Sequence, residues 1–204
     1  MQVTMLEEVT KNRYKVYLDE QFAFVLYKGE LSRFRIKMDS EVTDEVYSQI
    51  RNEIIIKRAK KRILHLLEQM PRTEQQITIK LRQNFYTDDV IKLAVDYAKS
   101  FGYINDANYA RSFVREKMRI KSRREIYCLL LGKGIDKEIA ENVLDDAFEE
   151  ESELDTIRNL ARKKGFDPEE TSDKEMQKIY SYLMRKGFSY AKICQVLRVS
   201  EWNA

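Results

Sequence analysis

One two-residue signal recurs along this chain and limits what the chain can fold into. Each copy pairs a residue that tolerates the left-handed backbone conformation with a large apolar residue directly after it. Such a pair ends a helix, because the first residue reverses the chain and the second packs back against the last turn. The copies are Asn84-Phe85, Gly102-Tyr103, Gly134-Ile135, Gly165-Phe166 and Gly187-Phe188. Five copies are not expected by chance, and they predict a series of helices joined by short turns.

Three of these helix ends open segments that match one another. Asn84, Gly134 and Gly187 are each followed by a residue suited to capping a new helix, and then by a helix with an apolar pair. The capping residues are Thr87, Asp136 and Ser189. In this alignment Asn84 takes the place of glycine, and Tyr86 is an inserted residue in the first copy. The spacing predicts a repeat of about 50 residues with three helices in each unit.

The expected fold is mostly α. A three-helix unit of this size buries little apolar surface alone, so neighbouring units are expected to stack. We therefore expect three tandem three-helix repeats in an elongated, curved array: repeat 1 at 57–105, repeat 2 at 106–152 and repeat 3 at 153–204. The helices are expected at 58–70, 73–83, 88–101, 106–119, 122–132, 137–150, 153–164, 173–186 and 190–199.

Residues 1–56 follow a different pattern and are expected to form an N-terminal extension made of a β-hairpin and a helix. Residues 13–18 alternate between polar and apolar side chains, and residues 22–27 are aromatic and favour β-structure. Residues 19–21 suit the turn between these strands. Thr43 is a helix N-cap with acidic residues directly after it, so a helix is expected to follow the hairpin.

The sequence argues against a membrane or secreted protein. No apolar run approaches the roughly 20 residues of a membrane span, and the opening MQVTMLEEVT does not resemble a signal peptide. Cys128 and Cys194 lie in apolar helical settings without metal-ligand spacing, so we expect both to be buried, reduced thiols. The protein is expected to be cytoplasmic.

No part of the sequence has the pattern of an active site. His65 is the only histidine, and it has apolar neighbours but no nucleophile or second base near it. We interpret it as a packing or rim residue of a helix. The sequence contains no glycine-rich phosphate loop. We therefore expect a protein that is not an enzyme, with no catalytic residue, no cofactor and no metal.

The strongest positive feature is a run of basic residues in the second repeat. Residues 111–133 hold eight basic and two acidic side chains, a net charge of +6, whereas residues 136–155 have a net charge of −9. Arg111, Arg115 and Arg119 recur every fourth residue and are expected to share one helix face, with Phe113 and Val114 turned to the core. The turn into the next helix adds Lys121, Arg123 and Arg124.

These six basic residues, here called the basic stripe, are the candidate partner-binding surface. Two acids are too few to neutralise the stripe through pairs four residues apart on a helix. A phosphate backbone or an acidic protein groove would complement it. A charged run is also often only a solvated helix face, and that interpretation stays open. Further candidates lie near helix ends, where the helix dipole alone favours cations: Lys80, Arg82, Arg185 and Lys186.

Three-helix units also invite comparison with helix-turn-helix domains that read the DNA major groove. In such domains the final helix enters the groove and has to be polar and cationic. The final helix of the second repeat, expected at 137–150, carries six acidic residues and one basic residue. Major-groove readout by all three units is therefore rejected.

Motifs along nearly the whole chain resemble those of one bacterial family. Residues 101–114, Phe-Gly-Tyr-Ile-Asn-Asp-Ala-Asn-Tyr-Ala-Arg-Ser-Phe-Val, resemble the Gly-Tyr-Leu-Asp-Asp…Phe-Ala…Phe-Val signature of the RecX regulators. Residues 121–126, 131–135, 185–190 and 193–197 are similar to further motifs of that family. Residues 12–24 resemble the hairpin extension found in many of its members.

The resemblance implies a fold and a function. RecX proteins consist of three tandem three-helix repeats, bind RecA filaments on single-stranded DNA, and restrain strand exchange, ATP hydrolysis and co-protease activity; some also bind DNA directly. We therefore expect a monomer that binds the RecA nucleoprotein filament and modulates it, in the direction of inhibition, with single- or double-stranded DNA as a further partner. Two alternatives stay open: a sequence-independent DNA-binding protein acting without RecA, and an adaptor that binds proteins only.

Overall fold

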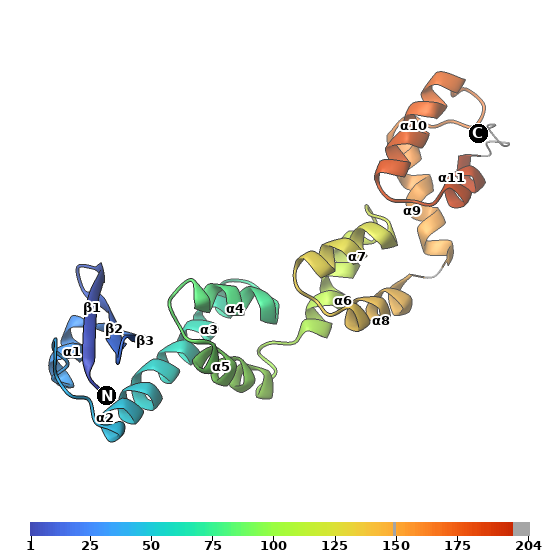
Figure 1. Cartoon of the computed structure of the whole chain (residues 1–204). Coiled ribbons are helices and arrows are strands. Elements are labelled where there is room, and N and C mark those ends of the chain that lie inside the picture. The colour runs from blue at the N-terminus through green and yellow to red at the C-terminus, as the bar shows by residue number, and fades with distance from the viewer. Residues whose placement is uncertain (149, 198–204) are drawn as a thin grey trace. The chain divides into compact units, whose positions relative to one another are not determined.

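The computed structural model describes residues 1–148 and 150–197, and it is mostly helical after an N-terminal sheet (Figure 1). The chain divides into two compact units, Met1–Asn105 and Asp106–Ala204. Unit 1 holds the sheet and the first three-helix repeat. Unit 2 holds the second and third repeats.

The sheet has three antiparallel strands in the order β1-β2-β3, with β1 at Val3–Thr10, β2 at Arg13–Leu18 and β3 at Gln21–Tyr27. The predicted hairpin is confirmed as β2 and β3, whereas β1 was not predicted. Glu7 lies in the middle of β1, where its carboxylate accepts hydrogen bonds of 2.9 Å from Lys15 Nζ and Tyr17 Oη. The apolar pattern of β1 is interrupted by Glu7 and Glu8, and the bonds that hold it to β2 depend on side chains of the other strand. The strand was therefore not recognisable from its own residues.

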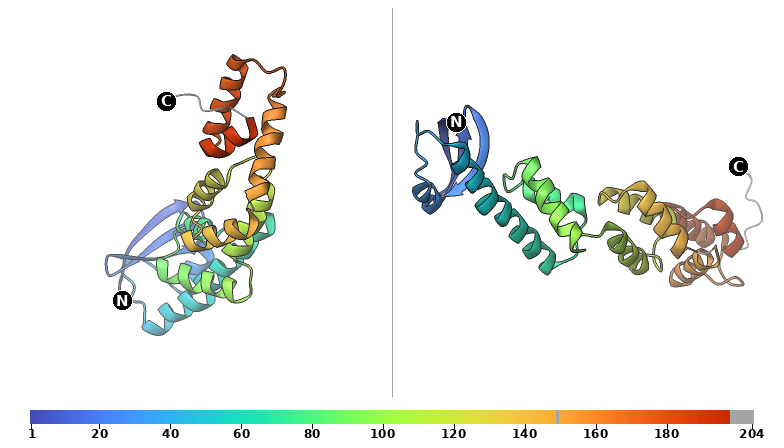
Figure 2. Two further views of the ribbon diagram at one scale, coloured as in Figure 1. Left: turned by 90° about the vertical axis from the view of Figure 1, so that its right-hand side faces the viewer. Right: turned by 90° about the horizontal axis from the view of Figure 1, so that it is seen from below.

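A continuous helical run leads from the sheet into the first repeat. After α1 (Lys28–Arg33), the run consists of α2 (Asp44–Gln49), the π-helical η1 (Ile50–Ile56) and α3 (Lys57–Gln69). Thr43 begins it as predicted, because Thr43 Oγ1 accepts a hydrogen bond of 3.4 Å from the backbone of Val46. One hydrophobic core extends from Val3 in the sheet to Ile104 at the end of the repeat. The sheet thus shares one core with the first repeat within unit 1, and the right view of Figure 2 shows it beside the beginning of the helical run that leads into α3.

Nine helices follow the predicted repeat pattern, with ends within three residues of those expected wherever the structure describes them. Repeat 1 consists of α3, α4 (Glu74–Arg82) and α5 (Asp88–Ser100). Repeat 2 consists of α6 (Asp106–Lys117), α7 (Arg123–Gly132) and α8 (Lys137–Ala147). Repeat 3 consists of α9 (Glu150–Lys163), α10 (Asp173–Arg185) and α11 (Tyr190–Leu197). Residues 198–199, expected in the last helix, lie outside the described residues.

The turn between α4 and α5 corrects the predicted alignment of the repeats. Phe85, rather than Asn84, has the positive φ angle, +64°, that Gly134 has at +80°. The N–H of Phe85 bonds to the carbonyl three residues earlier and that of Tyr86 to the carbonyl five residues earlier, as at Gly134 and Ile135. Phe85 therefore takes the glycine position, and Tyr86 is not an insertion.

Both cysteines were expected to be buried, and neither is fully buried. Cys128 is exposed and Cys194 is half-buried. On α7 the core-facing residues are Ile126 and Leu130, both fully buried. Cys128 lies midway between them in sequence, and two residues correspond to more than half a helical turn, so its side chain faces the opposite side.

Candidate partner-binding surface

The arginines of the basic stripe begin on α6 and continue into the turn after it. Arg111 and Arg115 are exposed, while Val114 between them is fully buried in the core of repeat 2. The helix ends at Lys117, so Arg119 lies in the following turn and not on the predicted common helix face. The earlier helix end follows from Ser122, which caps α7 and leaves only a few residues to reverse the chain.

Acidic neighbours neutralise part of the stripe, contrary to expectation. Lys121 forms an ion pair with Glu125 one turn further on, and both side chains are half-buried. Arg123 forms an ion pair with Asp145 on the acidic helix α8. These two cations are therefore already engaged within repeat 2.

The remaining arginines of the stripe keep their charge available. Arg115, Arg119 and Arg124 are exposed, and none of them forms an ion pair with the side chain of any residue in 1–148 or 153–197. Arg111 donates a hydrogen bond of 2.7 Å to the neutral side chain of Asn108. The four exposed guanidinium groups of Arg111, Arg115, Arg119 and Arg124 can thus meet an anionic partner.

The four further candidates differ in how far the fold already uses them. In unit 1, Arg82 pairs with Asp88 across the α4–α5 turn at 2.8 Å, and Lys80 is half-buried. In unit 2, Arg185 is exposed in the last turn of α10. Lys186 Nζ lies 5.9 Å from the centre of the Tyr182 ring. Arg82 serves the turn itself, whereas Arg185 faces solvent.

A buried polar joint connects repeats 2 and 3 within unit 2. Ser122 Oγ donates a hydrogen bond of 2.8 Å to the carbonyl oxygen of Lys186, and Thr156 Oγ1 donates one of 3.0 Å to that of Met118. Glu153, only 8% exposed, accepts a hydrogen bond of 3.4 Å from the backbone N–H of Arg123 in repeat 2 and, within repeat 3, one of 2.6 Å from Lys192 Nζ. This joint was not predictable from the sequence, because each of these residues has the pattern of an ordinary helix cap or surface position.

The joint brings two basic segments of the prediction together. A Cβ atom built on Gly187 would lie 3.9 Å from Cβ of Arg124 and 2.8 Å from Ser122 Oγ. The turn that carries Lys121–Arg124 therefore adjoins the turn that carries Arg185–Gly187. The basic end of α10 and the exposed end of the stripe belong to the same part of unit 2.

A cavity of about 630 Å³ lies beside this joint. Its basic side chains are Arg123, Arg124 and Lys192, and its acidic side chains are Glu141, Asp145 and Glu153. Three charges of each sign balance one another. The cavity therefore has no net attraction for an anion or a cation.

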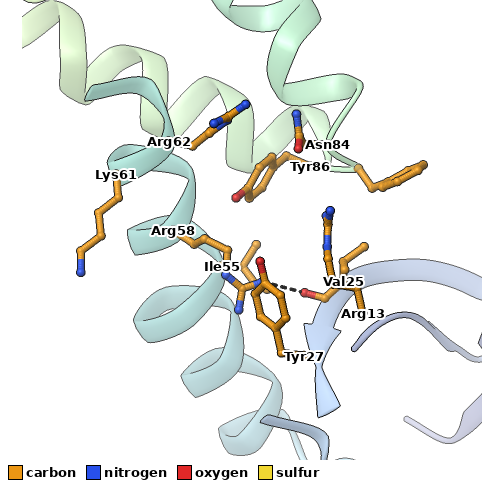
Figure 3. Close-up of a pocket in the computed structure, with 10 residues that line it drawn as sticks. Arg13, Val25, Tyr27, Ile55, Arg58, Lys61, Arg62, Asn84 and Tyr86 are labelled. Carbon is orange, nitrogen blue, oxygen red and sulfur yellow. Dashed lines mark hydrogen bonds between the residues drawn. The ribbon is translucent and has the colours of Figure 1, made fainter. Parts of the chain in front are cut away.

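Unit 1 contains a cavity of different character, which the sequence did not predict (Figure 3). Its volume is about 380 Å³, and four of its lining residues are basic while none is acidic. The lining residues are Arg13, Val25, Tyr27, Ile55, Arg58, Lys61, Arg62, Asn84, Phe85 and Tyr86. Two signals could have indicated it: the basic run at residues 57–62, and a phenylalanine in the glycine position of the repeat.

His65 lies exposed on α3, where its Nε2 is 3.2 Å from the side-chain nitrogen of Gln69 and its Nδ1 is 3.8 Å from Oε2 of Glu68. Among the side chains that the structure describes, at residues 1–148 and 153–197, no three histidine, cysteine, aspartate or glutamate residues group so that they could hold a metal ion. Over the same residues, none of the helices combines the length and the apolar character needed to cross a bilayer.

Fold and surface together define a class of protein: tandem three-helix repeats with an N-terminal antiparallel sheet and an exposed basic face. Comparison with known proteins agrees with this class. The family description "RecX, second three-helix domain" matches residues 105–144, and "RecX, third three-helix domain" matches residues 150–197.

Curated relatives and solved structures extend the match to almost the full chain. A "Regulatory protein RecX" from Caldanaerobacter subterraneus subsp. tengcongensis is 34% identical and covers 96% of this chain and 98% of its own. One from Clostridium botulinum (strain Eklund 17B / Type B) is 29% identical over 96% of this chain and 94% of its own. The solved "Crystal structure of regulatory protein RecX" is 25% identical, with a TM-score of 0.66 over 97% of this chain and 99% of that chain. A RecX structure from Lactobacillus salivarius is 29% identical, with a TM-score of 0.62 over 71% of this chain and 95% of that chain. The chain belongs to the RecX family of regulatory proteins.

Proposed function

We propose that this protein binds RecA filaments assembled on single-stranded DNA and lowers their recombinase, ATPase and co-protease activity. The observation that carries the proposal is the set of exposed guanidinium groups in repeat 2: Arg111, Arg115, Arg119 and Arg124. A nucleoprotein filament offers phosphates and acidic protein side chains to such a surface. Guanidinium groups suit both, because their planar fork matches phosphate and carboxylate oxygens.

The distribution of charge in repeat 2 supports an oriented mode of binding. The stripe at residues 111–124 precedes an acidic helix, α8, in which Lys137 is the only basic residue. An anionic partner is attracted by the unpaired arginines of the stripe and repelled by the acidic side chains of α8, which meet the stripe where Arg123 pairs with Asp145. The surface therefore favours docking of the stripe toward phosphate or carboxylate groups.

A second candidate function is sequence-independent DNA binding without RecA, since the same guanidinium groups suit a bare phosphate backbone. A third is an adaptor that binds protein only. The test is a co-sedimentation assay with RecA filaments on single-stranded DNA, with RecA alone and with DNA alone. The proposal expects tighter binding to the filament than to either component. Equal binding to DNA alone with a steep salt dependence favours the second candidate, and nuclease-resistant binding to RecA alone favours the third.

A further inference from the structure

The cavity in unit 1 is enclosed by three parts of the chain that the fold brings together. Arg13 comes from β2 and Tyr27 from the end of β3, while Arg58 and Arg62 come from α3, one turn apart. The α4–α5 turn supplies Phe85 and Tyr86. Figure 3 shows Arg62 reaching from α3 toward this turn and Arg13 rising toward it from the sheet. The walls are thus basic and aromatic at once.

Two arginines in these walls each have one buried N–H group that forms no hydrogen bond. The Nε atoms of Arg13 and Arg62 are both buried and form no hydrogen bond. Arg58 differs, because its guanidinium group donates to the Val25 carbonyl at 3.0 Å and pairs with Glu30. Folded proteins satisfy nearly all buried polar groups, so these two donors at one cavity have hydrogen-bonding capacity left for a bound group or water.

The turn above the cavity holds a bulky residue in the left-handed conformation. Phe85 has φ at +64°, whereas Gly134 and Gly187 take this position in the matching turns of repeats 2 and 3; Arg35, after α1, is a further helix-end residue other than glycine with positive φ, +55°. Residues other than glycine adopt this conformation infrequently, and residues with bulky side chains adopt it least often. Such strain concentrates at functional sites. Here it places an aromatic ring at the cavity wall, with Lys15 Nζ 4.8 Å from the ring centre.

We infer that this cavity binds one nucleotide of a single-stranded nucleic acid, with its phosphate at Arg13 and Arg62 and its base against the aromatic wall. Guanidinium groups bind phosphate through paired hydrogen bonds. Aromatic side chains stack on bases of any sequence, and proteins that bind single strands combine the two features. A volume of about 380 Å³ admits a single nucleotide but no duplex, which selects the unpaired strand.

The tyrosines of the cavity fit the same ligand. A tyrosine phenol is protonated at neutral pH, and burial raises the pKa of Tyr86 further, so its hydroxyl group can donate a hydrogen bond to a phosphate oxygen. Figure 3 shows the hydroxyl groups of Tyr27 and Tyr86 turned toward each other across the space between α3 and the sheet. The phenol of Tyr86 therefore adds a donor without adding a negative charge.

The inference does not depend on RecA, and it is tested with the full chain and a fluorescent oligothymidylate in the absence of RecA. Arg13→Gln with Arg62→Gln is expected to weaken binding at least roughly ten-fold, the loss typical when hydrogen bonds to a charged group are removed. The control is Lys28→Gln with Lys57→Gln, which removes the same charge from exposed positions outside the cavity. That control is expected to change affinity less than about three-fold, through the general charge effect alone. Equal losses in both variants would overturn the inference.

Competition experiments with inorganic phosphate and with an acidic peptide show whether the cavity prefers a nucleotide, a free phosphate or a carboxylate. The oligonucleotide is expected to bind more tightly than inorganic phosphate, and Phe85→Gly is expected to reduce affinity for the oligonucleotide but not for phosphate. An oligonucleotide that binds no more tightly than phosphate overturns the assignment. So does an acidic peptide that displaces the oligonucleotide at equal concentration, because the cavity would then be a site for carboxylates.

A measurement on the unaltered protein guards against variants that fail to fold. The ¹⁵N–¹H signals of the Arg13 and Arg62 Nε–H groups are expected to shift on titration with the oligonucleotide, whereas that of Arg72, outside the cavity lining, is expected to stay in place. Unshifted Arg13 and Arg62 signals at saturating oligonucleotide would contradict the inference, whatever the variants do. RecA-dependent activity is measured separately, so failure here leaves the proposed regulation of RecA untouched.

Discussion

Ser122 Oγ donates a hydrogen bond of 2.8 Å to the carbonyl oxygen of Lys186, and the two residues lie in successive three-helix repeats. The same hydroxyl oxygen accepts a hydrogen bond of 3.1 Å from the backbone N–H of Glu125 and so caps α7. Ser122 is fully buried. One small side chain thus begins a helix of repeat 2 and holds the last turn of α10 in repeat 3.

Replacing Ser122 with alanine is expected to lower the free energy of unfolding of unit 2 by about 2–3 kcal/mol. The lost cap accounts for about 1 kcal/mol, and the carbonyl left without its donor accounts for the rest. Ser172→Ala is the matched control, because Ser172 caps α10 at an exposed position and its loss is expected to be only about 1 kcal/mol. Urea denaturation measures both. Equal losses would show that the bond to Lys186 contributes nothing.

Gly187 and Gly165 offer a second test of the joint between the repeats. Both have positive φ, +85° and +84°, so alanine is strained at either position. At Gly165 a Cβ atom would meet nothing within 4 Å, whereas at Gly187 it would lie 2.8 Å from Ser122 Oγ. Gly165→Ala is therefore expected to cost about 1 kcal/mol, and Gly187→Ala about 1–3 kcal/mol more through displacement of Ser122. Thermal unfolding that ranks the two equally would contradict the close approach.

Because Phe85 has a positive φ, glycine is expected to destabilise the fold less than alanine at this position. Phe85→Ala and Phe85→Gly both remove the ring, so their difference isolates the backbone. Phe85→Gly is expected to be more stable than Phe85→Ala by about 1 kcal/mol, because glycine adopts this conformation without a steric penalty. Denaturant unfolding checks the order. An alanine variant at least as stable as the glycine variant would place the left-handed residue elsewhere in the turn.

The repeat pattern was predictable from the sequence because helix ends depend on local chemistry. Gly134 and Gly187 end helices through their own backbone freedom, and Ser122 caps one through its own hydroxyl group. Phe85 was misassigned for the opposite reason. Local preference favours Asn84 in the left-handed position, and tertiary contacts, among them Lys15 over the Phe85 ring, decide otherwise.

The candidate site was predictable only in part, because ion pairing depends on side chains far apart in the sequence. Arg115 is exposed as expected, but Arg123 pairs with Asp145, 22 residues later. The buried N–H groups of Arg13 and Arg62 come to line the same cavity only when the sheet packs against α3. The division of the chain at residue 56 and the role of the stripe stay predictions.

The cap of α10 predicts a dependence of stability on pH. The side chain of Ser172, and then its backbone N–H, donate to Glu175 and hold the pKa of that carboxyl below its ordinary value. A depressed pKa in the folded state stabilises the fold above the unfolded pKa, and this contribution is lost as the pH falls through the folded pKa. Below about pH 4.3, the ordinary glutamate value, α10 is expected to lose this stabilisation.

The pKa of Glu175, followed by NMR, checks the cap directly. In Ser172→Ala the pKa is expected to rise toward the ordinary value but not to reach it, since the backbone N–H still donates. A pKa of Glu175 that does not change on removal of the Ser172 hydroxyl would mean that the hydroxyl does not bind the carboxylate in solution.

Charge reversal in the stripe tests the binding surface. Arg115→Glu with Arg119→Glu is expected to weaken binding to the RecA filament at least roughly ten-fold, because two attractions to an anionic partner become repulsions, while circular dichroism stays unchanged. The matched control is Lys174→Glu with Lys178→Glu, two exposed cations with the same spacing on α10. The control is expected to retain most of its affinity. Equal weakening of both variants would show that only net charge matters.

The most direct test of the central claim is a titration of RecA ATPase activity on single-stranded DNA with the purified protein. The unaltered protein is expected to lower the ATPase rate in proportion to filament occupancy, and Arg115→Glu with Arg119→Glu is expected to require a correspondingly higher concentration. An ATPase rate that stays constant up to saturating protein, with no binding to the filament, would contradict the assignment of this chain as a regulator of RecA.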